Sequence, residues 1–334
     1  MKISVDELRS LVQRSLETIY PKQQSALMTE IMMYAQLAGI PSHGPIRLVI
    51  DKYGILFTKP EKEPELHRRT KISRRIDGNG NPGMLVAGMA MQEALSIAKE
   101  HDVAVVSTNG CWSTSGALSY YAETIAREGF IALFVSQSVP GVVPYGAKKP
   151  LFGTNPIGFG IPAQPDPIVF DMATSVTTYG DLARAKRAGE TLAEGIAFDS
   201  EGEPTTDPAA ALNGGVAPFD FGYKGSGLGM MVEILGGVLS GASFLGIREP
   251  QDGWGNLLLV LNPQLVMDAD EYYKRISEFV DHYLEAPVRQ GHKLRLPGSG
   301  TIARRHIAES SGEVEIDDAV VEEVRAYLLQ QRPE

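Results

Sequence analysis

The chain has 334 residues, 43% of them hydrophobic, and carries a formal net charge of −10. This length and apolar content suffice for a substantial core in one large or two moderate domains, and the negative charge argues against nucleic acid or anionic membrane as the main partner, because both attract positive surfaces. Cys111 is the single cysteine, which excludes an intrachain disulfide and a thiolate zinc site.

The N-terminal region predicts two helices that lead directly into a polar loop. Ser4 and Glu7 have the spacing of a capping box, so a helix is expected to begin there and to extend to about Ile19. Pro21 favours the start of a second helix, and Gly39 favours its end. The chain opens with charged residues rather than an apolar signal segment and has no run of about 18 apolar residues, so a cytoplasmic protein is expected.

The middle of the chain alternates helical and extended patterns. Residues 84–100 predict an amphipathic helix and residues 103–106 a short buried strand, which suggests a β-α-β beginning. Residues 117–128 predict another helix and residues 131–135 another strand. From about 140 to 218, short apolar runs alternate with Gly, Pro, Asn and Asp, a pattern typical of antiparallel strands and functional loops.

The last third predicts a glycine-interrupted helix over 226–240 and a strongly apolar strand over 257–261. Two further helices are expected at about 268–284 and 317–330, with a basic loop over 295–305 between them. No linker clearly separates two units. We therefore expect interleaved domains, with both chain ends contributing.

A dinucleotide-binding fingerprint is present but lies in an unsuitable context. Gly78-Asn79-Gly80-Asn81-Pro82-Gly83 matches G-x-G-x-x-G and precedes a predicted helix. The residues before it, 71–77, are too charged for the buried first strand of a parallel sheet. The strand after the helix leads into Ser107-Thr108-Asn109, without an acidic residue to bind a ribose hydroxyl. We interpret the motif as a glycine-rich turn at a helix N-terminus.

The most informative stretch is Ser42-His43-Gly44-Pro45-Ile46-Arg47. A histidine can exchange a proton near neutral pH, and an arginine can hold a carboxylate through two parallel hydrogen bonds. Together they predict a site that binds a small acid and moves a proton on it. A capped helix end with a surface histidine is the alternative.

Further polar turns follow in a fixed order along the chain. With SHG-x-x-R at 42–47 they are PYG at 144–146, GTNP at 153–156, DMATS at 171–175, PTTDP at 204–208, YKGSGL at 223–228 and LPG at 296–298. As an ordered set they resemble the type 2 malate/L-lactate dehydrogenase family, whose members are NAD(P)-dependent reductases unrelated to the Rossmann lactate dehydrogenases. Within that family the motifs come closest to the Δ1-piperideine-2-carboxylate and Δ1-pyrroline-2-carboxylate reductases.

The resemblance implies an α/β (α+β) protein with a non-Rossmann nicotinamide-binding fold. In that fold a largely antiparallel sheet is interleaved with a helical domain built from both chain ends, and a homodimer completes the active site. On this basis residues 1–70 with 265–334 would form the helical, substrate-side domain. Residues 71–264 would form the cofactor-binding domain.

The resemblance also implies roles for single residues. Ser42, His43 and Asp181 would be catalytic, with His43 as the proton donor. The substrate would be held by Arg47, Thr154 and Lys224. The cofactor-binding residues would be Thr114, Ser115, Gly116, Ala117, Leu118, Asp171, Met172, Ala173, Lys224, Gly225, Arg295, Leu296, Pro297 and Gly298. No metal site is expected, because no histidine pair has ligand spacing.

Asp181 bears on the choice of substrate. The cyclic ketimine reductases resemble this chain in having Asp at this position, whereas malate-type members commonly have Lys. An acidic residue there would orient His43, favour its protonated form and share a relay with Ser42. The alternative is that Asp181 is the N-cap of a helix over 182–188.

Two departures from the family pattern concern the cofactor. Thr114-Ser115 replaces a His-Phe pair, and Ser299 replaces the acidic residue that usually follows LPG. The second change leaves the choice between NADH and NADPH open. A 2′-phosphate could be bound by Arg295, Arg304 and Arg305, which favours NADP(H) over NAD(H), with an exposed basic loop as the alternative.

The sequence is interpreted as that of an NAD(P)H-dependent reductase that transfers hydride to a C=N bond next to a carboxylate. The substrate would be a cyclic ketimine or an N-alkyl imine, and the product an L-amino or imino acid. A 2-hydroxy-acid dehydrogenase of malate or lactate type uses the same parts and is the first alternative. A non-catalytic cofactor-binding protein is the second. The expected partners are a small carboxylate substrate and a second copy of the chain, not nucleic acid or membrane.

Overall fold

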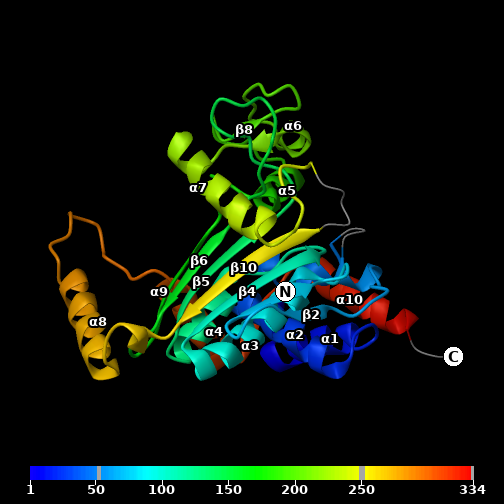
Figure 1. The fold of residues 1–334 in the computed structure, drawn as a ribbon. Helices are drawn as coiled ribbons and strands as arrows, with labels where there is room; N and C mark the ends of the chain where they lie inside the picture. The colour runs from blue at the N-terminus through cyan, green and yellow to red at the C-terminus, as the bar shows by residue number, and fades with distance from the viewer. Residues whose placement is uncertain (51–53, 248–252, 332–334) are drawn as a thin grey trace.

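The computed structural model describes residues 1–50, 54–247 and 253–331. At its centre is a seven-stranded sheet with the order β2-β3-β4-β10-β5-β6-β7 (Figure 1). Its strands are β2 (Glu65–Arg68), β3 (Ser73–Asp77), β4 (Val103–Cys111), β5 (Ile131–Gln137), β6 (Ile157–Ile161), β7 (Ile168–Met172) and β10 (Trp254–Leu261). Within this sheet β3 and β4 are parallel and the other neighbouring strands are antiparallel. The predicted mixed fold with a largely antiparallel sheet is confirmed.

Helices cover one face of this sheet and form the main core with it. The helices packed there are α1 (Val5–Leu16), α2 (Lys22–Leu37), α3 (Gly83–His101), α4 (Leu118–Arg127) and α10 (Asp318–Gln330). Ser4 caps α1 by accepting a hydrogen bond from Glu7 N (3.1 Å), as predicted, although α1 ends at Leu16 rather than near Ile19. The two chain ends meet where β1 (Lys2–Ser4) pairs with β11 (Glu313–Glu315).

A smaller layer lies at one end of the strands. It contains α5 (Tyr179–Ala188), β8 (Ala197–Phe198), α6 (Pro208–Asn213), β9 (Gly215–Val216) and α7 (Tyr223–Glu233). The predicted glycine-interrupted helix is present as α7, which continues into a π-helical turn, Ile234–Val238. This turn packs closely on the sheet at a strand glycine, because a Cβ on Gly255 of β10 would lie 2.2 Å from Gly236 O.

The basic segment 295–305 is not a loop throughout, which corrects the prediction. Helix α9 (Ser299–Ser311) begins directly after Gly298, whose φ of 81° lies in the left-handed region. Arg304 and Arg305 therefore belong to a helix, and the buried Ile302 anchors its inner side. The arginines were interpreted as an exposed basic loop, although arginine is also a good helix former. Of the helices in the described ranges, none combines the length and apolarity needed to cross a bilayer.

The G-x-G-x-x-G segment connects β3 to α3 in a parallel β-α-β crossover, yet its amides are engaged in the protein itself. Gly78 N, Gly80 N and Gly83 N donate to the carbonyls of Asn109, Gly110 and Trp112 at 2.7, 2.8 and 2.7 Å. A Cβ on Gly83 would lie 2.8 Å from Thr114 O. The glycines thus close a tight turn against β4, which supports the interpretation as a structural turn.

Candidate active site

The segment that follows α2 carries the predicted proton donor. Gly39 has a φ of 78°, and Ile40 N donates to Ala35 O at 2.8 Å, so α2 ends in a Schellman-type cap. Two short 3₁₀ turns follow, Pro41–His43 and Pro45–Leu48, each opened by a proline. Because proline fixes φ, these turns hold the segment in a defined shape.

The structure brings Ser42, His43 and Arg47 together. Ser42 Oγ lies 3.0 Å from His43 Nδ1, and Arg47 Nε donates to Ser42 O at 2.7 Å. The hydroxyl orients the imidazole, which leaves Nε2 as the ring nitrogen for a substrate. The first turn of α5 lies alongside, since a Cβ on Gly180 would be 3.4 Å from Ser42 Cβ.

Burial dominates the electrostatics of this group. The pKa of His43 is lowered to about 3, chiefly by burial and secondly by the nearby positive charge of Arg47, while Asp181 acts in the opposite direction. Burial also lowers the pKa of Arg47 to about 10. This value still lies well above neutral pH, so the guanidinium stays charged there. Without a substrate, the site therefore holds a neutral imidazole beside a cation.

An anion bound at Arg47 should raise the pKa of His43, because it offsets the positive charge that disfavours imidazolium. We expect a carboxylate inhibitor to be bound near neutral pH with uptake of up to about one proton per site. Calorimetry in two buffers of different ionisation enthalpy measures this uptake. His43→Asn should abolish it, and equal uptake by both proteins would show that another group titrates.

Asp181 is not the N-cap of α5, so the alternative interpretation of this residue as a helix cap is wrong. The helix begins at Tyr179, and Thr178 is its N-cap. Asp181 completes a capping box: its carboxylate accepts from Thr178 N (3.2 Å) and Thr178 Oγ1 (2.7 Å), and Thr178 Oγ1 accepts from Asp181 N. This carboxylate thus acts on His43 through its field, with its hydrogen bonds directed to the helix start.

The GTNP turn is tied to α7. Thr154 O accepts from Thr174 N at 2.8 Å. The buried Asn155 donates from Nδ2 to Gly229 O (3.0 Å) and to Glu233 Oε2 (2.7 Å). Burial raises the pKa of Glu233, while its hydrogen bonds act in the opposite direction. The sequence analysis missed Glu233, although a single acidic residue within an apolar helix was a signal for it.

Lys224 and Gly225 lie in the first turn of α7, next to a sharp bend. Asp220 Oδ1 accepts from Gly222 N (3.0 Å) and Gly225 N (2.8 Å). A Cβ on Gly225 would lie only 2.9 Å from Phe219 N, so the bend requires glycine there. Lys224 is exposed at this helix start.

Two of the predicted cofactor segments meet at one cavity. It has a volume of about 180 Å³ and is lined by Tyr34, Ile40, Ser119, Glu123, Val169, Phe170, Asp171, Pro297, Gly298 and Thr301. We call it the α4–α9 pocket. Asp171 Oδ2 accepts from Ser119 N at 2.8 Å, and Ser119 Oγ is buried without a hydrogen-bond partner among the described residues. A carboxylate and an unused hydroxyl are suited to sugar hydroxyls, so these residues fit a nucleotide cofactor.

The other predicted cofactor residues lie around this pocket or near it. Met172 and Ala173 continue from Asp171 at the end of β7, Leu296 precedes Pro297, and Arg295 is exposed. The segment from Thr114 to Leu118 leads into α4, but its hydroxyls are used internally. Thr114 Oγ1 accepts from Gly116 N (3.0 Å) and Ser115 Oγ donates to Asn256 Oδ1 (2.9 Å). Ala117 and Leu118 are buried beside them.

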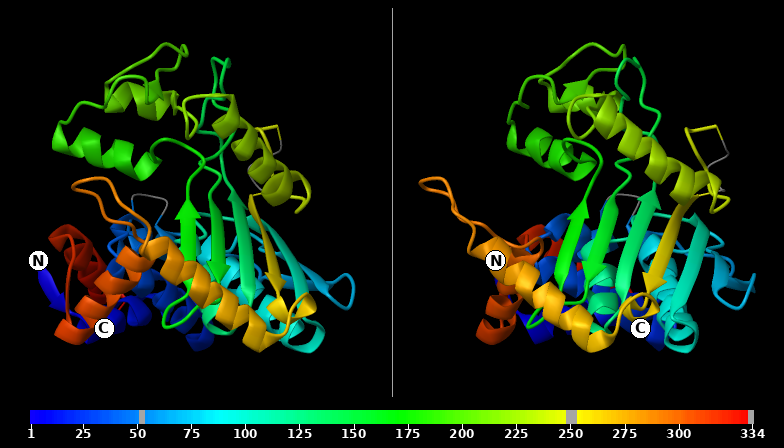
Figure 2. Two further views of the ribbon diagram at one scale, coloured as in Figure 1. Left: turned by 90° about the vertical axis from the view of Figure 1, so that its left-hand side faces the viewer. Right: turned by 60° about the vertical axis from the view of Figure 1, so that its left-hand side comes forward.

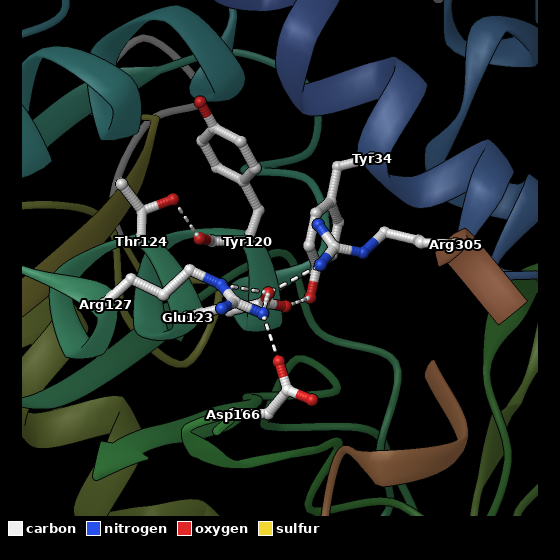
Figure 3. A network of polar contacts seen from close by, with 7 residues as sticks. All are labelled: Tyr34, Tyr120, Glu123, Thr124, Arg127, Asp166 and Arg305. Carbon is white, nitrogen blue, oxygen red and sulfur yellow. Dashed lines mark hydrogen bonds and ion pairs between the residues drawn. The ribbon is translucent and has the colours of Figure 1, made fainter. Parts of the chain in front are cut away.

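A buried ion-pair network forms one wall of the α4–α9 pocket (Figure 3). Glu123 lies at its centre and is 2% exposed. It accepts hydrogen bonds from Tyr34 OH (2.9 Å), Arg127 Nε (2.8 Å) and Arg305 Nη2 (2.5 Å). The guanidinium of Arg305 also lies 4.4 Å from the centre of the Tyr34 ring. Sequence reasoning missed Glu123 and Tyr34, because the residues of this network come from three separate helices, α2, α4 and α9.

Replacing Glu123 with glutamine should destabilise the fold, because Arg305 would keep a largely buried charge without its partner. We expect the free energy of unfolding to fall by about 3–5 kcal/mol, measured by urea denaturation. Glu128→Gln is the control at the end of the same helix, since its ion pair with Lys99 is exposed and worth less than about 1 kcal/mol. Equal losses in both variants would contradict a structural role of the buried pair.

Comparison with known proteins now defines the class of enzyme. The malate/L-lactate dehydrogenase family model matches residues 3–325. The chain belongs to this family and is an NAD(P)-dependent oxidoreductase, as the resemblance of its motifs predicted.

Three similar proteins illustrate the range of the family. The chain is 34% identical to the Δ1-pyrroline-2-carboxylate/Δ1-piperideine-2-carboxylate reductase of Pseudomonas putida, with 93% of each chain covered. It is 32% identical to the L-sulfolactate dehydrogenase of Methanothermobacter thermautotrophicus, covering 97% of this chain and 95% of that one. Among solved structures, a dehydrogenase from Sinorhizobium meliloti matches with a TM-score of 0.87 and 29% identity over 98% of both chains.

Proposed function

We propose that this protein is an NAD(P)H-dependent reductase of a C=N bond next to a carboxylate, in a cyclic ketimine or an N-alkyl imine. The product would be an L-amino or imino acid. The observation that carries the proposal is the group formed by Ser42, His43 and Arg47, in which a neutral imidazole lies beside a charged guanidinium. A ketimine nitrogen is often already protonated at neutral pH. Its reduction therefore does not require a proton from His43, whose lowered pKa leaves the imidazole neutral.

Each residue of the site has a proposed role in binding or proton transfer. Arg47 and Thr154 hold the substrate carboxylate, and Arg47 offers the fork geometry that matches two oxygens. Ser42 orients His43, whose Nε2 hydrogen-bonds the substrate nitrogen and supplies a proton where one is needed. Asp181 favours the protonated imidazole through its field. The reduced nicotinamide, when bound, supplies the hydride.

The cofactor is proposed to be held by the α4–α9 pocket and by the segments at its rim. Asp171 and Ser119 offer an acceptor and a hydroxyl for the sugar, Gly298 also lines the pocket, and Lys224 and Gly225 are proposed to lie towards the substrate. The proposed preference for NADP(H) rests on Arg295 as the cation for a 2′-phosphate. Arg304 Nε donates to Ala38 O (2.7 Å) and Arg305 is paired with Glu123.

A second candidate is a 2-hydroxy-acid dehydrogenase that reduces a 2-oxo acid. The 32% sequence identity with the L-sulfolactate dehydrogenase favours this candidate. Arg47 would again bind the carboxylate, and His43 would again donate the proton. It requires a protonated His43, so its rate should depend more strongly on that residue. We also propose that the enzyme is a cytoplasmic homodimer.

The test follows NADPH and NADH consumption with three substrates side by side. They are Δ1-piperideine-2-carboxylate, pyruvate with methylamine, and oxaloacetate. Turnover with the two imine substrates and none with oxaloacetate would support ketimine reduction. Turnover with oxaloacetate alone would assign the enzyme to the hydroxy-acid branch instead.

A further inference from the structure

Helix α7 is the common neighbour of three of the polar turns that form the motif set. Its Ser226 Oγ accepts a hydrogen bond from Tyr145 N of the PYG turn at 2.7 Å. A Cβ on its Gly229 would lie 3.2 Å from Thr174 Oγ1 of the DMATS turn. Asn155 of the GTNP turn donates from Nδ2 to Gly229 O at 3.0 Å. The position of α7 therefore bears on all three turns at once.

Glu233, the last residue of α7, is an acidic residue buried in an otherwise apolar part of this helix. Its Oε1 accepts from Leu245 N at 2.8 Å, and its Oε2 accepts from Asn155 Nδ2 at 2.7 Å. Burying a carboxylate costs free energy unless donors surround it, so an apolar residue would serve packing better. In both views of Figure 2, α7 lies across one end of the sheet strands, whereas α8 (Ala269–Leu284) lies towards the other end.

Two acceptors fix the amide of Asn155 in one orientation. Nδ2 donates to both Gly229 O and Glu233 Oε2, so turning the amide over would place Oδ1 against these two oxygens. Oδ1 is buried without a hydrogen-bond partner among the described residues. The residue also has a φ of 41°, in the left-handed region that asparagine tolerates better than most side chains. The side chain of Asn155 is therefore tied to α7 at the expense of its own oxygen.

Thr154 precedes Asn155 directly, so the contact with α7 also sets the backbone of Thr154. On its other side, Thr154 O accepts from Thr174 N (2.8 Å) and from Thr174 Oγ1 (3.2 Å). The turn has little room to shift, because a Cβ on Gly153 would lie 2.2 Å from Ser138 Oγ. A backbone held on both sides fixes the direction in which the half-buried Thr154 side chain leaves it.

We propose that Glu233 is a positioning residue for substrate recognition, which acts through Asn155 on Thr154. This role rests on the function proposed above, in which Thr154 and Arg47 hold the substrate carboxylate. Helix α7 also carries Lys224 in its first turn, so the contact between Glu233 and Asn155 sets that cation relative to Thr154. Glu233 itself does not touch the substrate. It holds the residues that do, and a misplacement of about 1 Å in such residues can cost about 100-fold in rate.

The test replaces Glu233 with glutamine, which has the same shape but one acceptor fewer. Both carboxylate oxygens accept from N–H groups, so the glutamine amide must turn its NH₂ towards either Leu245 N or Asn155 Nδ2, donor against donor. We expect Glu233→Gln to raise KM for the carboxylate substrate about 10-fold, while kcat and the dissociation constant of the cofactor change less than about 3-fold. Asn155→Gly should have the same effect, because glycine adopts the positive φ freely.

A double variant shows whether Glu233 acts through Thr154. Thr154→Val removes the hydroxyl that is proposed to bind the carboxylate, so it should raise KM by itself. If Glu233 acts through that hydroxyl, adding Glu233→Gln to Thr154→Val should change KM by less than about 2-fold. Two effects that multiply in the double variant would show that Glu233 acts by another route, against the proposal.

Leu8→Ala is the control for a loss of stability alone. Leu8 is buried in α1 and belongs to the main core. Its truncation should lower the urea midpoint of unfolding and leave KM unchanged at temperatures where the protein stays folded. A Glu233→Gln protein that loses stability in the same way but keeps the wild-type KM would overturn the positioning role.

The kinetic assay uses whichever of the three substrates named above the wild type reduces. Picolinate, which has a ring nitrogen next to a carboxylate, gives a second measurement by calorimetry in the presence of the cofactor, and Glu233→Gln should weaken its binding about 10-fold. A wild type that neither reduces the substrates nor binds picolinate would overturn the proposed function together with this role. A wild type that does either, matched by an equally effective Glu233→Gln protein, would overturn this role alone.

Discussion

Replacing His43 with asparagine should lower kcat for a 2-oxo acid by about 10²- to 10⁴-fold, the range that a positioned general acid contributes. The same change should cost much less with a cyclic ketimine, because its nitrogen already carries the proton. Asparagine retains a polar side chain next to Ser42, so the turn Pro41–His43 should persist. Steady-state rates with oxaloacetate and Δ1-piperideine-2-carboxylate, together with NAD(P)H binding by fluorescence, measure the difference.

His67→Asn on the edge strand β2 is the matched control, since this histidine is half-buried and does not line the α4–α9 pocket. It should leave both rates unchanged. Unaltered reduction of the 2-oxo acid by His43→Asn would remove the proton-donor role. An equal and large loss on both substrates, with cofactor binding also lost, would instead indicate a local folding defect.

The elements that sequence analysis located best are those whose pattern is local. The Ser4 cap, the end of α2 at Gly39 and the helix α4 all follow from a few neighbouring residues. The strand β4 extends to Cys111, beyond the predicted end at 106, because β10 pairs along its polar part as well. That pairing joins segments about 150 residues apart, which no local pattern records. The helical start of α9 was missed for a related reason, since its inner side is anchored by tertiary packing of Ile302.

In the candidate site, too, the features set by neighbouring residues were predicted and those set by the whole fold were not. Ser42, His43 and Arg47 are close in sequence, and the structure brings them into hydrogen-bond contact. The low pKa of His43 was not predictable, because burial, its largest cause, depends on the whole fold. That Asp181 orients His43 or shares a relay with Ser42 stays a prediction; in the structure its carboxylate accepts a hydrogen bond from Thr178 Oγ1.

Arg47 should be the residue on which recognition of the substrate carboxylate depends most. A hydrogen-bonded charge pair contributes about 1.5–3 kcal/mol, so Arg47→Lys, which keeps the charge but loses the fork, should raise KM by roughly 10- to 100-fold. The effect on kcat should be smaller if binding is equal in the ground and transition states. Steady-state kinetics over a range of carboxylate concentrations separates the two parameters.

An amide analogue of the substrate distinguishes recognition from folding. Arg47 Nε also donates to Ser42 O, so a substitution disturbs the turn that positions His43. If Arg47 acts through the carboxylate, Arg47→Lys should penalise the acid far more than the amide, and the wild type should prefer the acid by a similar factor. Equal penalties on both compounds would mean that Arg47 serves the shape of the turn. In that case the carboxylate must be held elsewhere, with Lys224 at the start of α7 as the next cation to test.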